Sequence, residues 1–176
     1  VIMTTGSLSL GNMVTGQSGW HGMAWNVVLQ PLGFLIFLIC AFAETNRTPF
    51  DLPESETELI GGYHTEYSSM KLGFYLFAEY INMFLSSAVI SCLYFGGYNF
   101  PFMDIVQQNT GEILFAFICF LVLMTKILFF IFFFFWVRWT IPRFRFDQLM
   151  NLGWKILLPL SIINMLITGT IILLNQ

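Results

Sequence analysis

Long apolar runs separated by short polar segments dominate the pattern along this chain. An α-helix needs about 20 mostly apolar residues to cross the hydrocarbon core of a bilayer, because lipid offers no partners for backbone polar groups. Runs of about that length occur at 25–43, 72–98, 113–137 and 156–174. The pattern therefore predicts an all-α fold, a polytopic bundle of four transmembrane helices.

The segments between these runs differ in composition. Residues 1–24 contain five glycines and are expected to form a helix remnant followed by a loop, 44–71 an acidic loop, 99–112 a loop, and 138–155 a basic loop. Pro31 and Pro159 fall near the starts of the first and last runs. A helix tolerates proline best there, so both runs are still expected to be helical.

The tryptophans and the basic residues agree with four crossings. All five tryptophans lie at or near the ends of runs, as in the aromatic belts of membrane interfaces: Trp20, Trp25, Trp136, Trp139 and Trp154. Four crossings place six of the seven basic residues on one face: Arg47, Lys71, Arg138, Arg143, Arg145 and Lys155. By the positive-inside tendency, this face is the cytoplasm or, in a mitochondrion, the matrix.

Composition excludes a water-soluble domain, because 57% of the residues are hydrophobic and only 7 basic and 10 acidic side chains are present. Cys40, Cys92 and Cys119 lie in apolar runs, without a spacing that could hold zinc or an iron–sulfur cluster. The sequence also has no glycine-rich phosphate loop and no nucleophile elbow. The chain is therefore expected to carry no metal or flavin and to bind no nucleic acid.

Acidic residues are concentrated in one part of the chain. Seven of the ten lie between positions 44 and 79: Glu44, Asp51, Glu54, Glu56, Glu58, Glu66 and Glu79. One explanation is a solvated acidic loop. However, Pro49, Phe50 and Leu52 interrupt the acidic residues, which favours a stiff segment that packs against the membrane surface.

Two ionisable residues, Glu79 and Lys126, lie inside predicted spans. A charge at the bilayer centre costs on the order of 2.5–3.5 kcal/mol and is usually kept for a purpose. At about 1.5 Å per residue, Glu79 lies roughly 10 Å into its span and Lys126 roughly 18 Å from Arg138. These two residues indicate a structural ion pair within the bundle, or else a proton path or ligand cavity.

A further charged cluster follows the third run: Arg138, Arg143, Arg145 and Asp147. Basic residues at a helix end can simply orient the chain or contact lipid head groups. A more specific hypothesis is that Arg143 or Arg145 holds a loop carboxylate, such as Asp51 or Glu56, through a bidentate fork.

Two motifs resemble those of a known family, the quinone-site membrane subunit of respiratory complex I, called subunit 1 in mitochondria. The first motif is AETNRTPFDLPE at 43–54, continued by Gly62-Tyr63, Glu66-Tyr67 and Ala78-Glu79-Tyr80. The second is PRFRFDQLM at 142–150, followed by Trp154-Lys155. Lys126 also lies where the family has a lysine. Two long motifs in the right order and separation argue against a chance match.

The resemblance implies a subunit of a proton-pumping NADH–ubiquinone oxidoreductase. Electrons from NADH would reach ubiquinone, the substrate, through redox centres in other subunits, and this chain would form part of the quinone cavity and of the proton route. The implied proton-route residues are Glu44, Glu54, Glu56, Glu58, Glu66, Glu79 and Lys126. The implied residues of the quinone cavity and its loop are Arg47, Phe50, Asp51, Arg138, Arg143, Arg145 and Asp147.

The resemblance covers the whole chain but only the C-terminal half of the family's usual length. Expected partners are a separate chain that supplies the N-terminal half, the quinone-site subunits of the hydrophilic arm, other complex I subunits and membrane lipids; a fragment of a longer chain is the other explanation. The 21 phenylalanines suit an AT-rich organellar genome. A split gene and the mitochondrial inner membrane are therefore expected, with a bacterial plasma membrane as the alternative.

Two other functions remain open. Buried Glu and Lys also suit a secondary proton or cation transporter, although four spans without a visible inverted repeat argue against that class. A structural membrane anchor is the other alternative, and an anchor needs no lysine in mid-membrane.

Overall fold

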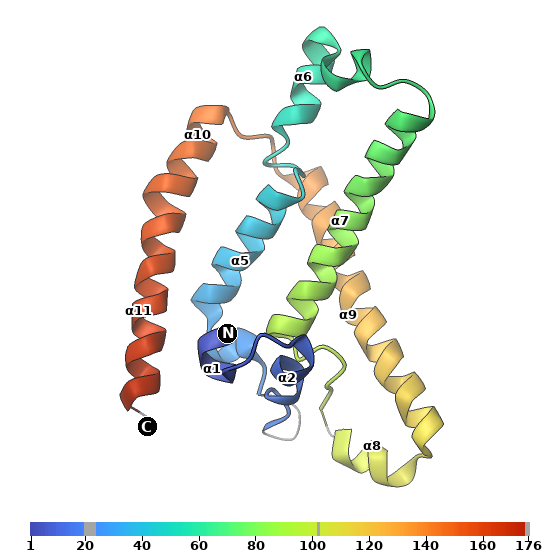
Figure 1. The fold of residues 1–176 in the computed structure, drawn as a ribbon, viewed down its shortest axis with the longest axis vertical. Helices are drawn as coiled ribbons and strands as arrows, with labels where there is room; N and C mark the ends of the chain where they lie inside the picture. Colours follow the sequence, from blue (N-terminus) through green and yellow to red (C-terminus); the bar gives the residue numbers. More distant parts are fainter. Residues whose placement is uncertain (20–23, 102, 175–176) are drawn as a thin grey trace.

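The computed structural model describes residues 1–19, 24–101 and 103–174, and every regular element in this part of the chain is a helix (Figure 1). The predicted all-α class is confirmed for these residues, whereas Trp20 of the predicted aromatic belt lies outside them. The longer helices are α5 (Pro31–Glu44), α7 (Met70–Tyr94), α9 (Glu112–Thr140) and α11 (Leu158–Leu174). The shorter helices are α1 (Ile2–Thr5), α2 (Leu10–Thr15), α4 (Asn26–Leu29), α6 (Leu52–Ile60), α8 (Met103–Asn109) and α10 (Phe146–Asn151).

Among the described residues, three helices are long and apolar enough to cross a membrane: α7, α9 and the continuous helix Phe146–Leu174. The prediction of a fourth such span is not confirmed, because α4 and α5 divide the first run and α5 has only 14 residues. The break falls at Gln30, whose φ of −134° and ψ of 63° are not helical. A proline ring disfavours the helical conformation in the residue before it, so Pro31 starts a new helix.

Other helix ends differ from those expected from hydropathy. α7 ends at Tyr94 and not at 98, because Gly96 and Gly97 turn the chain at φ values of 68° and 53°. Residues 146–155 of the expected basic loop are helical, so only 141–145 remain as a linker. A π-helical turn, η2 (Leu152–Leu157), lies just before Pro159. The wider turn accommodates a proline whose ring would clash with a regular α-helix.

Helices α5, α7 and α9 form the hydrophobic core. Its buried side chains are Ala41, Phe42, Phe50, Met83, Ile90, Phe130 and Phe134. The rings of Phe42 and Phe134 lie 4.3 Å apart between centroids. Ser87 and Ser91 of α7 are fully buried, and each hydroxyl donates to the carbonyl one turn earlier at 2.8 Å. Such small side chains allow helices to approach closely.

The segments predicted to share one face lie at the same end of the bundle. The segment between α5 and α7, here called the acidic segment (residues 45–69), contains α6 and a 3₁₀ turn, η1 (Gly62–Thr65). Figure 1 shows α6 and α10 at one end, and α1, α2, α8 and the C-terminus toward the other. The acidic segment and the 141–145 linker are therefore neighbours.

Candidate functional site

The start of the acidic segment is a buried turn. Thr45 is buried, and its hydroxyl donates to the carbonyl of Ala41 at 3.0 Å, which satisfies one of the last carbonyls of α5. Asn46 has a φ of 48°, a left-handed conformation that Asn tolerates better than most residues. The amide of Phe50 then donates to the carbonyl of Arg47 at 2.8 Å. This turn also buries the side chains of Arg47, Thr48, Phe50 and Asp51.

Arg47 of this turn pairs with Glu79 of α7. Its Nε lies 3.1 Å from Oε1 of Glu79, and the two side chains are 4% and 27% exposed. The guanidinium also lies 4.7 Å from the centroid of the Tyr80 ring, within cation–π range. Neither Nε nor Nη2 makes a well-aligned hydrogen bond to a described residue, so the contact with Glu79 is mainly between charges. A buried guanidinium needs such a counter-charge.

Arg143 of the linker contacts two carboxylates of the acidic segment. Its Nη1 donates to Oε1 of Glu58 at 3.0 Å, and its Nη2 lies 4.0 Å from Oδ2 of the buried Asp51. Two further contacts join the same segments: the amide of Phe144 donates to the carbonyl of Pro49 at 3.0 Å, and the rings of Phe144 and Phe50 lie 5.7 Å apart. Charge, backbone and aromatic contacts thus dock the turn on the linker.

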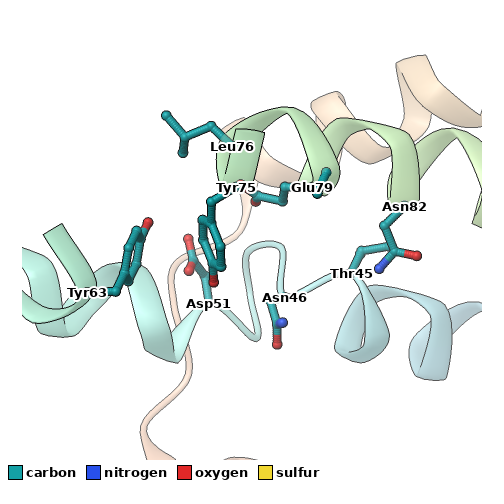
Figure 2. Close-up of a pocket in the computed structure, with 9 residues that line it drawn as sticks. Thr45, Asn46, Asp51, Tyr63, Tyr75, Leu76, Glu79 and Asn82 are labelled. Carbon is teal, nitrogen blue, oxygen red and sulfur yellow. The ribbon is translucent and has the colours of Figure 1, made fainter. Parts of the chain in front are cut away.

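A cavity of about 330 Å³ opens where this turn faces α7. Figure 2 shows Asp51, Tyr75 and Glu79 close together, with Tyr63 at one end and Thr45 and Asn82 at the other. The rings of Tyr63 and Tyr75 lie 4.7 Å apart. The cavity therefore combines two carboxylates, each beside an arginine, with aromatic rings and an amide.

A second cavity, of about 360 Å³, lies between α5 and α7. It is largely apolar and is lined by Phe37, Cys40, Ala41, Glu44, Asn82, Leu85, Ser86 and Val89. Asn82 borders both cavities, and its amide group lies 3.4 Å from the carbonyl oxygen of Glu44. Glu44 is thus beside the second cavity, and Glu79 beside the first.

The remaining predicted site residues are more peripheral. Glu56 and Glu66 are exposed, and Glu54 lies in α6 with a side chain outside the described part. Asp147 lies in the first turn of α10, where the backbone amide of Arg145 donates to Oε1 of Gln148 at 3.2 Å. Arg138 is half-buried in the last turn of α9. Across the described residues, no group of His, Cys, Asp or Glu has the arrangement of a metal site.

Lys126 lies apart from these carboxylates. Its ammonium group donates to the backbone carbonyls of Phe95, Gly97 and Asn99, and it forms no salt bridge with any described residue. The structure therefore brings Arg47, Asp51, Glu79 and Arg143 together and leaves Lys126 elsewhere.

Sequence reasoning missed Tyr75 and Asn82 as lining residues. Both are on α7, four residues before and three residues after Glu79, which places all three on one helix face. This spacing was visible in the sequence once Glu79 was taken as a site residue.

Comparisons with known proteins identify relatives along the whole chain. A family profile described as NADH dehydrogenase matches residues 1–169. The first of two H-type subunits of NADH-quinone oxidoreductase from Cytophaga hutchinsonii is 64% identical over 99% of this chain and 49% of its own length. The H-type subunit from Flavobacterium johnsoniae is 65% identical over 98% of this chain and 49% of its own, and NADH-quinone oxidoreductase subunit 8 of Rhodothermus marinus is 50% identical over 95% and 50%.

These relatives bear on two expectations. This chain spans about half the length of the curated relatives it matches. The relatives are bacterial, which does not support a mitochondrial location and fits the plasma-membrane alternative. The matched range and the identities are far above what a shared membrane-helix composition would produce, so the chain belongs to the NADH dehydrogenase family, whose bacterial members include the H-type membrane subunits of NADH-quinone oxidoreductase.

Proposed function

We propose that this chain serves as a membrane part of a proton-pumping NADH–quinone oxidoreductase, where it forms part of the quinone cavity and of the proton route. Its partners would be the remaining half of the subunit, the quinone-site subunits of the hydrophilic arm and other subunits of the complex. The names of its relatives support this assembly. The plasma membrane of a bacterium is the proposed location.

The observation that carries the proposal is the pairing of two buried charges beside one cavity, Arg47 with Glu79 and Asp51 with Arg143. Ionisable residues inside a membrane protein generally mark ion or proton pathways. Reduction of a quinone to a quinol takes up two electrons and two protons, so a carboxylate-lined cavity beside the quinone suits the reaction. A quinone ring would also find apolar and aromatic walls there, in Tyr63 and Tyr75.

Within this proposal, Glu79 and Glu44 relay protons away from the acidic segment, and Asn82 lies between their two cavities. Arg47 and Arg143 hold the carboxylates in place and oppose negative charge on reduced quinone. The acid-rich outer wall would consist of Glu54, Glu56, Glu58 and Glu66, together with Phe50, Arg138, Arg145 and Asp147 at its edge. The contacts of Lys126 support a different role, which is argued below.

The test replaces Glu79 by Gln in the complete assembly, because Gln keeps the shape and removes the titrating group. Proton pumping coupled to quinone reduction should fall sharply while the complex still assembles. Electron transfer from NADH to a water-soluble artificial acceptor should stay normal, because it bypasses the membrane site. Glu66→Gln is the matched control, since Glu66 is an exposed glutamate of the acidic segment, and should behave as wild type.

The alternatives give other outcomes. A secondary transporter would move protons or cations in vesicles without NADH or quinone. A structural anchor would tolerate Glu79→Gln with normal coupled turnover, and that result would end the relay proposal in favour of a purely structural ion pair with Arg47.

A further inference from the structure

The ammonium group of Lys126 is enclosed by the turn that follows α7. Its Nζ lies 2.7 Å from the carbonyl oxygen of Phe95, 2.8 Å from that of Gly97, and also donates to the carbonyl of Asn99. An ammonium group has three donors and no acceptor, so these three oxygens use its full capacity. The ring of Trp25 lies 5.0 Å from Nζ on another side, within cation–π range.

The positive φ values of Gly96 and Gly97 allow the carbonyls of this turn to converge. The close approach of Gly97 to the N-terminal segment supports the same geometry, because a Cβ there would lie 2.9 Å from Cγ2 of Val14. The side chain of Asn99 in turn donates to the carbonyl of Val14 at 2.7 Å. The arrangement of oxygens is therefore fixed by backbone geometry and by a neighbouring segment, and not by Lys126 alone.

The turn also belongs to a wider set of caps on the end of α7. The last carbonyls of a helix have no partner within the helix and carry a partial negative charge. Here Gln17 and Asn26 donate to the carbonyl of Leu93 at 3.2 and 2.8 Å. Lys126 supplies the only formal charge among these caps, so its cation faces the negative end of α7.

We propose that the carbonyls of Phe95, Gly97 and Asn99 form a binding site for a primary alkylammonium group, and that Lys126 fills this site as a fixed cation that fastens α9 to the end of α7. Proton transfer would break the site, because loss of a proton removes one of three donors from three oxygens. This inference concerns the packing of the bundle and does not depend on the function proposed for the acidic segment.

The test uses the complete assembly and asks whether a free amine can replace the side chain. Lys126→Ala removes the atoms of n-propylammonium from the site, and should lower the melting temperature of the complex by several degrees. Added n-propylammonium should restore part of the loss. Tetramethylammonium at the same concentration, which has the charge but no N–H donor, should not, and neither cation should change the wild type.

Thr125→Val is the matched control, because Thr125 is exposed and its hydroxyl donates only within α9, to Leu121 at 2.8 Å. It should melt as wild type. Lys126→Arg is the second variant, for the case in which the alanine variant does not assemble. Its planar fork cannot direct three donors to three converging oxygens, so it should melt below wild type.

Proton pumping separates this role from a relay. In the Lys126→Ala complexes that remain intact, the number of protons pumped per electron should equal that of wild type. Any one of three results would overturn the proposal: wild-type melting of Lys126→Ala or of Lys126→Arg, equal effects of the two cations, or wild-type melting together with lost pumping. The last result would make Lys126 a proton relay.

Discussion

Arg143 holds two carboxylates of the acidic segment, and their burial decides which contact matters more. The contact with Glu58 is shorter, 3.0 Å against 4.0 Å for Asp51, but Glu58 is 63% exposed and Asp51 only 5%. Exposed ion pairs contribute about 0.2–1 kcal/mol. Removing the cation beside a buried carboxylate is far more costly. At this residue, the longer contact is therefore the important one.

The neighbouring arginines give a matched pair of variants. We expect Arg143→Lys to lower NADH:quinone reductase activity several-fold, because a lysine cannot direct separate nitrogens at Asp51 and Glu58. NADH oxidation with an artificial acceptor should stay near normal. Arg145→Lys keeps the charge, and the backbone cap of α10 is unaffected, so it should retain wild-type activity. Equal quinone activity in both variants and wild type would return the cluster to a role in orientation or lipid contact.

Among the helices, the end of α7 is defined by backbone conformation. Hydropathy continues past Tyr94, but the chain leaves the helix there because Gly96 and Gly97 adopt a left-handed conformation. Gly73 lies inside the same helix, with no atom within 4 Å of the place where a Cβ would be. The glycines inside the helix and just after its end thus have opposite requirements.

Substitution of these glycines should separate the two requirements. Gly97→Ala should destabilise the complex by about 1–2 kcal/mol from the left-handed backbone alone, with a further cost from the 2.9 Å approach to Val14. Gly73→Ala should be neutral or stabilising by up to about 1 kcal/mol, because alanine favours the helix. Thermal denaturation of the assembled complex measures both. A Gly97→Ala complex as stable as wild type would contradict the close approach to Val14.

The helices show which structural features a sequence can predict. Long apolar runs predicted α7, α9 and the last span, since spanning lipid requires length and hydrophobicity that composition records directly. The break at Gln30 and the helical residues 146–155 were missed, because hydropathy does not register backbone geometry. In the site, sequence motifs identified Arg47 and Glu79 separately. Their pairing depends on the turn that folds residue 47 back onto α7, and no local pattern indicates it.

On the scale of the whole molecule, the bundle leaves polar groups on surfaces that would face lipid. Glu44, Asn82 and Ser86 line the open cavity between α5 and α7, and α11 has no buried residue in the described structure. Polar groups without partners are costly in a bilayer. The relatives are about twice as long as this chain, so protein equivalent to their other half is the expected cover.

Cross-linking in the native complex tests that cover. A photoreactive group at Ser86 should attach to polypeptide equivalent to the missing half, whether that half is a separate chain or continuous with this one. Mass analysis of the native complex should find the same sequence. A native complex in which no polypeptide supplies that half would contradict the prediction.

The backbone bond between Phe144 and Pro49 has a consequence for observing the acidic segment in solution. Residues 141–145 are exposed, yet the amide hydrogen of Phe144 is bound to a carbonyl of another segment. No side-chain substitution deletes that donor unless the new residue is proline. Deuterium uptake at this single amide, compared between the resting and the working complex, therefore reports the seating of the acidic segment without a label that would disturb it.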